Sequence, residues 1–268
     1  MTPYFYVDVH THLTHEQFTD DLGEVIARAE NAGLGAIVVN GLEPVSNRAI
    51  LQMASLHPVV KPALGIYPID GVHALLPADF PLQVEGFSVE DEIHFIRTCA
   101  QQGQLAAIGE CGLDGHWCDE STFAAQEKVF EALLDIAYTS NIPAIIHSRR
   151  LEQRTFEILR NLGIRKANLH CYGGKTKWAL EAAEKNGYWF SIPAHARVSE
   201  SFQKLLKMLP PEKILTETDA PYLSPQKGTR NEPANVVHTV RLFAELRKIS
   251  VDEARRQIHY NYQTLFDQ

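Results

Sequence analysis

The stretch VDVHTHL, Val7 to Leu13, joins an apolar, β-branched run to two histidines separated by one residue. In an extended strand residues i and i+2 project to the same face, so Asp8, His10 and His12 point the same way. The chain holds 12 histidines in 268 residues, and that composition alone produces roughly half an H-x-H match by chance. The His10–His12 pair alone therefore does not indicate a metal site; other ionisable residues of the chain would have to lie close to it in the fold.

Short apolar segments alternate with amphipathic ones along the whole chain. Eight strands are predicted, over 4–9, 36–40, 59–68, 105–110, 142–148, 166–172, 188–193 and 213–219. Helices are predicted over 17–33, 46–57, 91–103, 121–141, 152–163, 175–187, 199–209, 233–248 and 251–266. Strands this apolar are typical of a parallel sheet that is covered on the outside. The segment 70–86 is expected to be irregular, and Pro62 disfavours the first half of the third strand.

This alternation predicts a single-domain α/β fold, a TIM (β/α)8 barrel over residues 1–268. No linker, low-complexity segment or repeat divides the chain. An open doubly wound sheet is the alternative, but no G-x-G-x-x-G sequence follows the first strand. The chain also lacks an apolar run of about 18 residues and a secretory signal. We therefore expect a cytoplasmic protein that does not bind membranes.

The net charge and the cysteine content argue against a protein that coats nucleic acid and against a fold held by structural zinc or disulfides. The net charge is −8 at pH 7, and basic residues occur only in short local groups. Tight, non-specific coating of nucleic acid is therefore not expected, because it requires a basic face. The four cysteines show no C-x-x-C spacing, which argues against a structural zinc site and against disulfides in a reducing compartment.

Ionisable side chains follow five of the predicted strands. In a barrel the carboxyl ends of all strands open on one face, so residues roughly 200 apart in sequence converge there. An imidazole or carboxylate that follows an apolar run is costly to bury without a partner, and shared metal ligation would supply one. The six candidate ligands are His10, His12, Glu110, His147, His170 and Asp219.

This donor set contains nitrogen and oxygen but no sulfur. It suits zinc, manganese, nickel or iron, and magnesium less well because of the histidines. Six ligands are too many for one tetrahedral ion with an open position, so two divalent ions bridged by Glu110 are predicted. The other ligands divide into His10, His12 and Asp219 for one ion and His147 and His170 for the other. Asp8 is expected to accept the second ring N–H of a histidine.

The sequence resembles the TatD family of metal-dependent deoxyribonucleases. The matching motifs are DVHTHL (8–13), GECGLD (109–114), IHSR (146–149), HCYGG (170–174), ETDAPYL (217–223) and RNEP (230–233), in the family's order. The resemblance covers nearly the whole chain and implies a TIM barrel of the amidohydrolase superfamily, a divalent metal site and hydrolysis of DNA, often from the 3′ end. It also implies the same six ligands, with Glu110 where related amidohydrolases have a carboxylated lysine.

Two segments depart from the family pattern. GIYP, residues 65–68, stands where the family usually has G-x-H-P, so Tyr67 replaces an imidazole. GHWC, residues 115–118, replaces the aromatic pair that commonly follows the aspartate. Both lie near the expected entrance for substrate, and neither changes a metal ligand.

The leading hypothesis is a two-metal 3′-5′ exodeoxyribonuclease that acts on single-stranded DNA ends, without an obligate protein partner. Asp219 is the expected proton acceptor, and Glu110 the bridging catalytic carboxylate. Candidate substrate contacts are Tyr67, Arg149, Lys175 and Arg230, and the aromatic candidates for base stacking are Trp117, Tyr172 and Tyr222.

Two other functions fit the sequence less well. An amidohydrolase-type enzyme that acts on a small-molecule ester, lactone, amide or phosphoester is favoured slightly by the negative charge and by Tyr67. A non-catalytic binding protein on a decayed barrel is disfavoured, because decay would be expected to remove at least one of the six ligands.

Overall fold

Eight parallel strands form one sheet, in the order β1 to β8, in the computed structural model, which describes residues 4–81 and 85–266. The strands are β1 (Tyr6–Thr11), β2 (Leu34–Asn40), β3 (Val60–Leu64), β4 (Ala107–Asp114), β5 (Ala144–Arg149), β6 (Ala167–Leu169), β7 (Trp189–Pro193) and β8 (Ile214–Glu217). Each strand pairs with the next. The N–H of Asp219 donates to His10 O over 2.9 Å, and that of His12 to Ala220 O over 2.8 Å, which joins the end of the sheet to its beginning. The predicted TIM-like barrel is confirmed.

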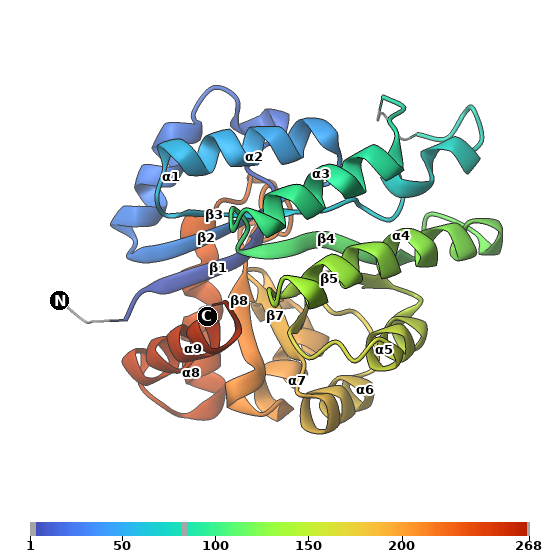
Figure 1. Ribbon diagram of the computed structural model, residues 1–268. Helices are drawn as coiled ribbons and strands as arrows, with labels where there is room; N and C mark the ends of the chain where they lie inside the picture. Colours follow the sequence, from blue (N-terminus) through green and yellow to red (C-terminus); the bar gives the residue numbers. More distant parts are fainter. Residues whose placement is uncertain (1–3, 82–84, 267–268) are drawn as a thin grey trace.

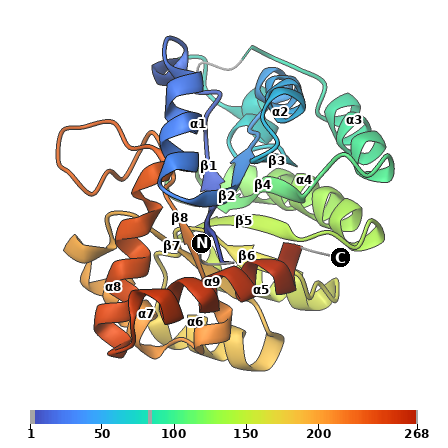
Figure 2. The same cartoon turned by 90° about the vertical axis from the view of Figure 1, so that its left-hand side faces the viewer.

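Helices surround the strands on the outside (Figures 1 and 2). They are α1 (Leu22–Asn31), α2 (Pro44–Leu56), α3 (Val89–Gln101), α4 (Glu120–Thr139), α5 (Glu152–Asn161), α6 (Thr176–Glu181), α7 (Glu200–Met208), α8 (Val237–Arg247) and α9 (Val251–Phe266). The first begins five residues later than predicted, because residues 16–18 form a separate 3-10 turn. The helix α6 continues into a π-helical turn, Ala182–Asn186, which ends at Gly187 with φ 76°. Residues 70–75, expected to be irregular, form a 3-10 helix.

The prediction for the fourth strand was wrong at its carboxyl end. We expected a strand that ends at Glu110 and then a loop, but β4 continues to Asp114 and pairs with β5 as far as Arg149. The pairing is irregular between Ile108 and Cys111, which is where Glu110 lies. Gln126 supports the added segment from α4: its side chain accepts from Asp114 N (2.8 Å) and donates to Asp114 O (3.0 Å).

Two glycines allow the strands to approach closely at this end of the barrel. A Cβ on Gly65 would lie 2.2 Å from the carbonyl oxygen of Glu110. Gly112 has φ +149°, and a Cβ there would lie 1.9 Å from the carbonyl oxygen of His147. Only glycine fits such positions. Pro62 is tolerated inside β3, where its carbonyl oxygen accepts a hydrogen bond from Ala106 N (2.8 Å).

The helix α9 packs against the amino ends of β1 and β8. Phe5, just before β1, meets the ring of His259 edge-on at 4.3 Å. Asn261 donates to the carbonyl oxygens of Pro211 (2.7 Å) and Ile214 (2.6 Å), beside the start of β8. Figure 2 shows α9 running across this end, near the N-terminus. The strands' carboxyl ends lie at the other end of the barrel. No helix in the described ranges is long and apolar enough to cross a membrane.

Candidate metal centre

The carboxyl ends of five strands bring the six candidate ligands together. His10 lies near the carboxyl end of β1 and His12 just after that strand, Glu110 lies in β4, His147 in β5, His170 follows β6 and Asp219 follows β8. Four of them are buried, at 0% to 7% exposed, and the side chains of His147 and Asp219 keep 13% and 16% exposure. The cluster is thus nearly closed on the barrel side and opens toward solvent at these two side chains.

The carboxylate of Glu110 lies between two pairs of imidazoles. Its Oε2 is 3.5 Å from His10 Nε2 and 3.4 Å from His12 Nε2. Its Oε1 is 2.9 Å from His147 Nδ1 and 3.0 Å from His170 Nε2. One carboxylate therefore offers one oxygen to each of two neighbouring positions, which is the arrangement that a bridging ligand needs.

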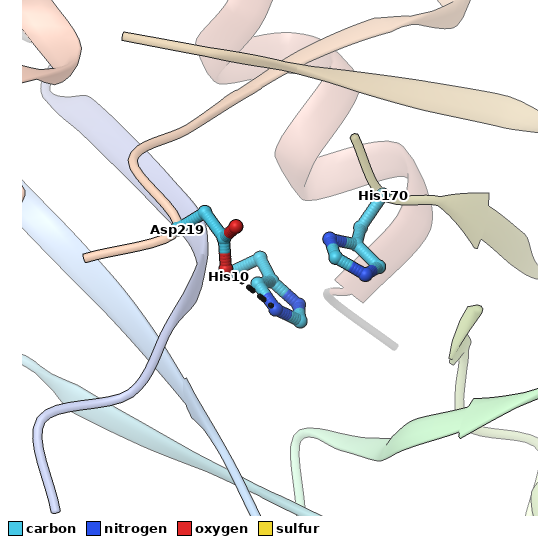
Figure 3. Close-up of side chains that lie close together, drawn as sticks. All are labelled: His10, His170 and Asp219. Carbon is cyan, nitrogen blue, oxygen red and sulfur yellow. Dashed lines mark ion pairs between the residues drawn. The ribbon is translucent and has the colours of Figure 1, made fainter. Parts of the chain in front are cut away.

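Asp219 completes the His10–His12 side of the cluster. Its Oδ1 lies 3.5 Å from His10 Nε2 and 3.4 Å from His12 Nε2. Figure 3 shows Asp219, His10 and His170 converging from three different elements, with the His10–Asp219 ion pair dashed. The rings of His10 and His170 stack in parallel with centroids 3.7 Å apart.

These contacts define three overlapping groups that could hold metal ions. The groups are His10, His170 and Asp219; His10, His12 and Glu110; and Glu110, His147 and His170. In each group the donor atoms lie within 4.8 Å of one another. Four imidazoles and two carboxylates in this space fit the nitrogen and oxygen coordination of divalent transition metals, so the cluster is consistent with a binuclear site.

Electrostatics within the cluster keeps both carboxylates ionised. Burial alone would raise the pKa of Glu110, but the imidazoles of His170 and His10 and hydrogen bonds with histidine lower it well below its ordinary value. Burial opposes ionisation of Asp219 as well, yet its hydrogen bonds with His10 and His12 lower its pKa. Burial, and then repulsion from His170, lowers the pKa of His10 to about 4, which favours the neutral imidazole that a metal requires.

Two ligand candidates are oriented by hydrogen bonds on their far side. His12 Nδ1 lies 3.2 Å from the carbonyl oxygen of Asn40, which directs Nε2 at Glu110. His147 Nε2 lies 2.8 Å from Asp114 Oδ2, which directs Nδ1 at Glu110. Asp114 was not among the predicted site residues, although it is the last residue of the GECGLD motif. The predicted strand stops at residue 110, four residues short of Asp114, so the motif alone could have indicated this residue.

The expected role of Asp8 was wrong in its detail. In the part of the chain that the structure describes, Asp8 accepts hydrogen bonds from Thr218 N (2.9 Å), Thr218 Oγ1 (2.5 Å) and His10 N (3.3 Å), and none from an imidazole ring. Thr218 follows β8, so Asp8 ties β1 to β8 directly behind His10.

A second buried acid, Glu217, was not predicted. Its carboxylate accepts a hydrogen bond from Ser191 Oγ (2.5 Å), and its Oε1 lies 3.9 Å from His170 Nδ1.

A cavity of about 650 Å³ opens over the cluster. Five of the candidate metal ligands line it: His12, Glu110, His147, His170 and Asp219. The other lining residues are Thr14, His15, Leu42, Glu43, Val45, Ser46, Ala49, Tyr67, Trp117, Arg149 and Tyr222. Of the four predicted substrate contacts, Tyr67 and Arg149 therefore border the cavity. Tyr67 meets the His147 ring edge-on at 5.1 Å.

The other two predicted substrate contacts are directed elsewhere. Arg230 binds Asp21 through two hydrogen bonds of 2.8 and 2.6 Å and lies over the ring of Phe18 at 4.6 Å. Lys175 precedes α6, and its ammonium lies 4.8 Å from the ring centroid of Trp178. Tyr172, a candidate for base stacking, is 1% exposed and also lies outside the lining.

An α/β barrel that gathers histidines and carboxylates at the carboxyl ends of its strands is the architecture of metal-dependent hydrolases with an amidohydrolase-like fold. The chain belongs to the TatD family, because the family model described as TatD related DNase matches residues 7–267. It is a metal-dependent hydrolase of that family.

Individual relatives agree with this assignment. An uncharacterised metal-dependent hydrolase of Bacillus subtilis is 30% identical over 264 residues, which cover 97% of this chain and 98% of the relative. A 3′-5′ ssDNA/RNA exonuclease of Erwinia tasmaniensis is 30% identical over 271 residues, 97% of this chain and 99% of the relative. The crystal structure of a TatD homologue from Escherichia coli superimposes with a TM-score of 0.84 over 98% of both chains at 24% identity and has the same fold.

Proposed function

We propose that this chain hydrolyses phosphodiester bonds of DNA and removes nucleotides from the 3′ ends of single strands. The observation that carries the proposal is the Glu110 carboxylate, whose two oxygens face two separate histidine pairs. His10, His12 and Asp219 would hold one divalent ion and His147 and His170 the other. Such a pair lowers the pKa of a water and neutralises the oxygens of a phosphodiester. The name of the Erwinia tasmaniensis relative supports the same substrate class.

The residues of the chain itself would position substrate and move the proton. Asp219 has a lowered pKa, borders the cavity and is partly exposed, so its carboxylate can accept a proton from the attacking water. Arg149 lines the cavity and offers a guanidinium to a phosphate oxygen. Tyr67 lies against His147, borders the cavity and carries a hydroxyl at the sequence position where the family pattern has an imidazole.

The test uses protein freed of metal with a chelator and reloaded with zinc, manganese, magnesium, nickel or iron. A 5′-labelled single-stranded oligonucleotide, a nitrophenyl phosphodiester and a panel of lactones and amides are offered to each form. We expect stepwise shortening of the oligonucleotide from its 3′ end, abolished by the chelator and by Glu110→Ala. Glu131→Ala, an exposed glutamate on α4, is the matched control that keeps activity. Turnover of lactones or amides alone would overturn the proposal, and full cleavage by Glu110→Ala would overturn the bridging role of Glu110.

A further inference from the structure

The cavity is poor in positive charge for a site that binds DNA. Among the lining residues Arg149 is the one lysine or arginine, while Arg230 and Lys175 are directed elsewhere. A groove that tracks a nucleic-acid strand requires a series of cations along the backbone. Among the described residues that line this cavity, Arg149 is the one such cation.

An acidic side chain, Glu43, also lines the cavity and is held in place at the start of α2. Glu43 caps that helix: its Oε2 accepts from Val45 N over 2.5 Å and its Oε1 from Ser46 N over 2.7 Å. These bonds satisfy the helix's first N–H groups with a carboxylate of the protein, so they are not offered to a phosphate of the substrate. Glu43 therefore adds a negative charge to the cavity lining, which disfavours a second phosphate of a long strand there.

The rest of the wall suits bases. Leu42, Val45 and Ala49 line the same side as Glu43 and are apolar. Two exposed aromatic side chains flank the metal cluster: Tyr222, at 50% exposed, has its ring 6.5 Å from that of His12, and Trp117 is 54% exposed.

Trp117 belongs to the other side of the cluster. Its backbone N–H donates to Asp114 Oδ1 over 2.9 Å, and Asp114 Oδ2 lies 2.8 Å from His147 Nε2. The Trp117 ring centroid lies 5.9 Å from the guanidinium carbon of Arg149, which also lines the cavity. One aromatic residue is thus found on the side of each histidine pair, and both residues line the cavity. Because every base has a face that stacks on such a ring, the two rings can take the two bases on either side of one phosphodiester bond.

We propose that the site recognises a dinucleotide unit, one phosphodiester bond with its two bases, and that Glu43 is the specificity-determining residue that discriminates against longer strands. This inference rests on the proposed phosphodiesterase function. It assigns the substrate as short oligonucleotides, such as those left by other nucleases, rather than long single strands. A volume of about 650 Å³ lies within the range of pockets that enclose one small ligand.

The experiment compares kcat/KM for a dinucleotide and for a 12-nucleotide single strand, each with one 3′ end per molecule. We expect the dinucleotide to match or exceed the 12-mer, and the 12-mer to show a shallow salt dependence, with a log–log slope near −0.7, as for about one phosphate contact. Glu43→Gln keeps an oxygen for the helix cap and should raise the 12-mer-to-dinucleotide ratio at least about threefold. The matched control Glu131→Gln should leave that ratio unchanged. Trp117→Ala and Tyr222→Ala should each lower kcat/KM for the dinucleotide about tenfold.

The possible results distinguish a failure of the dinucleotide preference from a failure of the proposed phosphodiesterase function. Cleavage of neither substrate overturns the phosphodiesterase function, and the inference with it. A 12-mer cleaved at least tenfold faster than the dinucleotide, with a steep salt dependence, overturns the inference alone and leaves the function standing. An unchanged ratio in Glu43→Gln overturns the role of Glu43.

Discussion

Replacing Asp114 by asparagine tests how the far side of the cluster controls its metal affinity. Asp114 Oδ2 lies 2.8 Å from His147 Nε2, while Oδ1 accepts from the backbone N–H groups of His116 (2.7 Å) and Trp117 (2.9 Å). In Asp114→Asn those two donors hold the amide oxygen in place of Oδ1, so the amide NH2 points at His147. His147 Nε2 must then accept, which moves the ring proton to Nδ1, the atom that faces Glu110.

A protonated Nδ1 cannot bind metal, so the variant loses either the ligand or the new hydrogen bond. Changes to such partners cost about 10- to 100-fold in metal affinity, and we expect the upper end of that range, about 2.7 kcal/mol. Competition with a chromophoric chelator measures the affinity, and circular dichroism checks the fold. Asp119→Asn, the same charge change at the cap of α4, is the control. Wild-type affinity for both ions in Asp114→Asn would refute the reasoning.

Three further predictions follow from the buried charges. Glu110→Gln should bind fewer than two metal ions per chain by elemental analysis, because a neutral amide is a poor bridge; retention of two ions would contradict this. Removal of metal by a chelator should lower the melting temperature by on the order of 5–10 °C, since ligands of the native state stabilise it, and an unchanged value would contradict a native metal site. Asp70 is buried and its Oδ1 has no hydrogen-bond partner among the described residues, and burial raises its pKa from 3.8 to about 8. The native state therefore disfavours its ionisation, so Asp70→Asn should be the more stable form by at least about 2 kcal/mol at pH 8, a difference that disappears as the pH falls to about 4. Urea unfolding across this range measures it, and a difference that does not vary with pH would count against the explanation.

The barrel and the convergence of the six ionisable side chains could be predicted because both follow from local patterns. Apolar runs that end in an imidazole or carboxylate mark strands and their carboxyl ends, and a barrel brings those ends together. Their role as metal ligands stays a prediction. The end of β4 was missed because glycines at 109 and 112 interrupt the apolar pattern, and the support for Asp114 comes from Gln126 on the following helix.

Long-range pairing of surface groups could not be predicted in the same way. Arg230 looked available for phosphate, but its partner Asp21 lies 209 residues earlier in the chain. Asp8 was expected to contact a histidine and instead binds Thr218, 210 residues away. Local sequence does not say which distant donor or acceptor a side chain will meet once the barrel closes.

The hydrogen bonds that join β1 to the segment after β8 also bear on the synthesis of the protein. His10 and His12 leave the ribosome early and Asp219 late, and Asp219 N donates to His10 O only once the two ends of the sheet have met. A nascent chain shorter than this therefore lacks both the seam and one of its carboxylate donors. We expect the ion held by His10, His12 and Asp219 to be acquired only after nearly the whole chain has been translated, so that this ion marks a completed molecule.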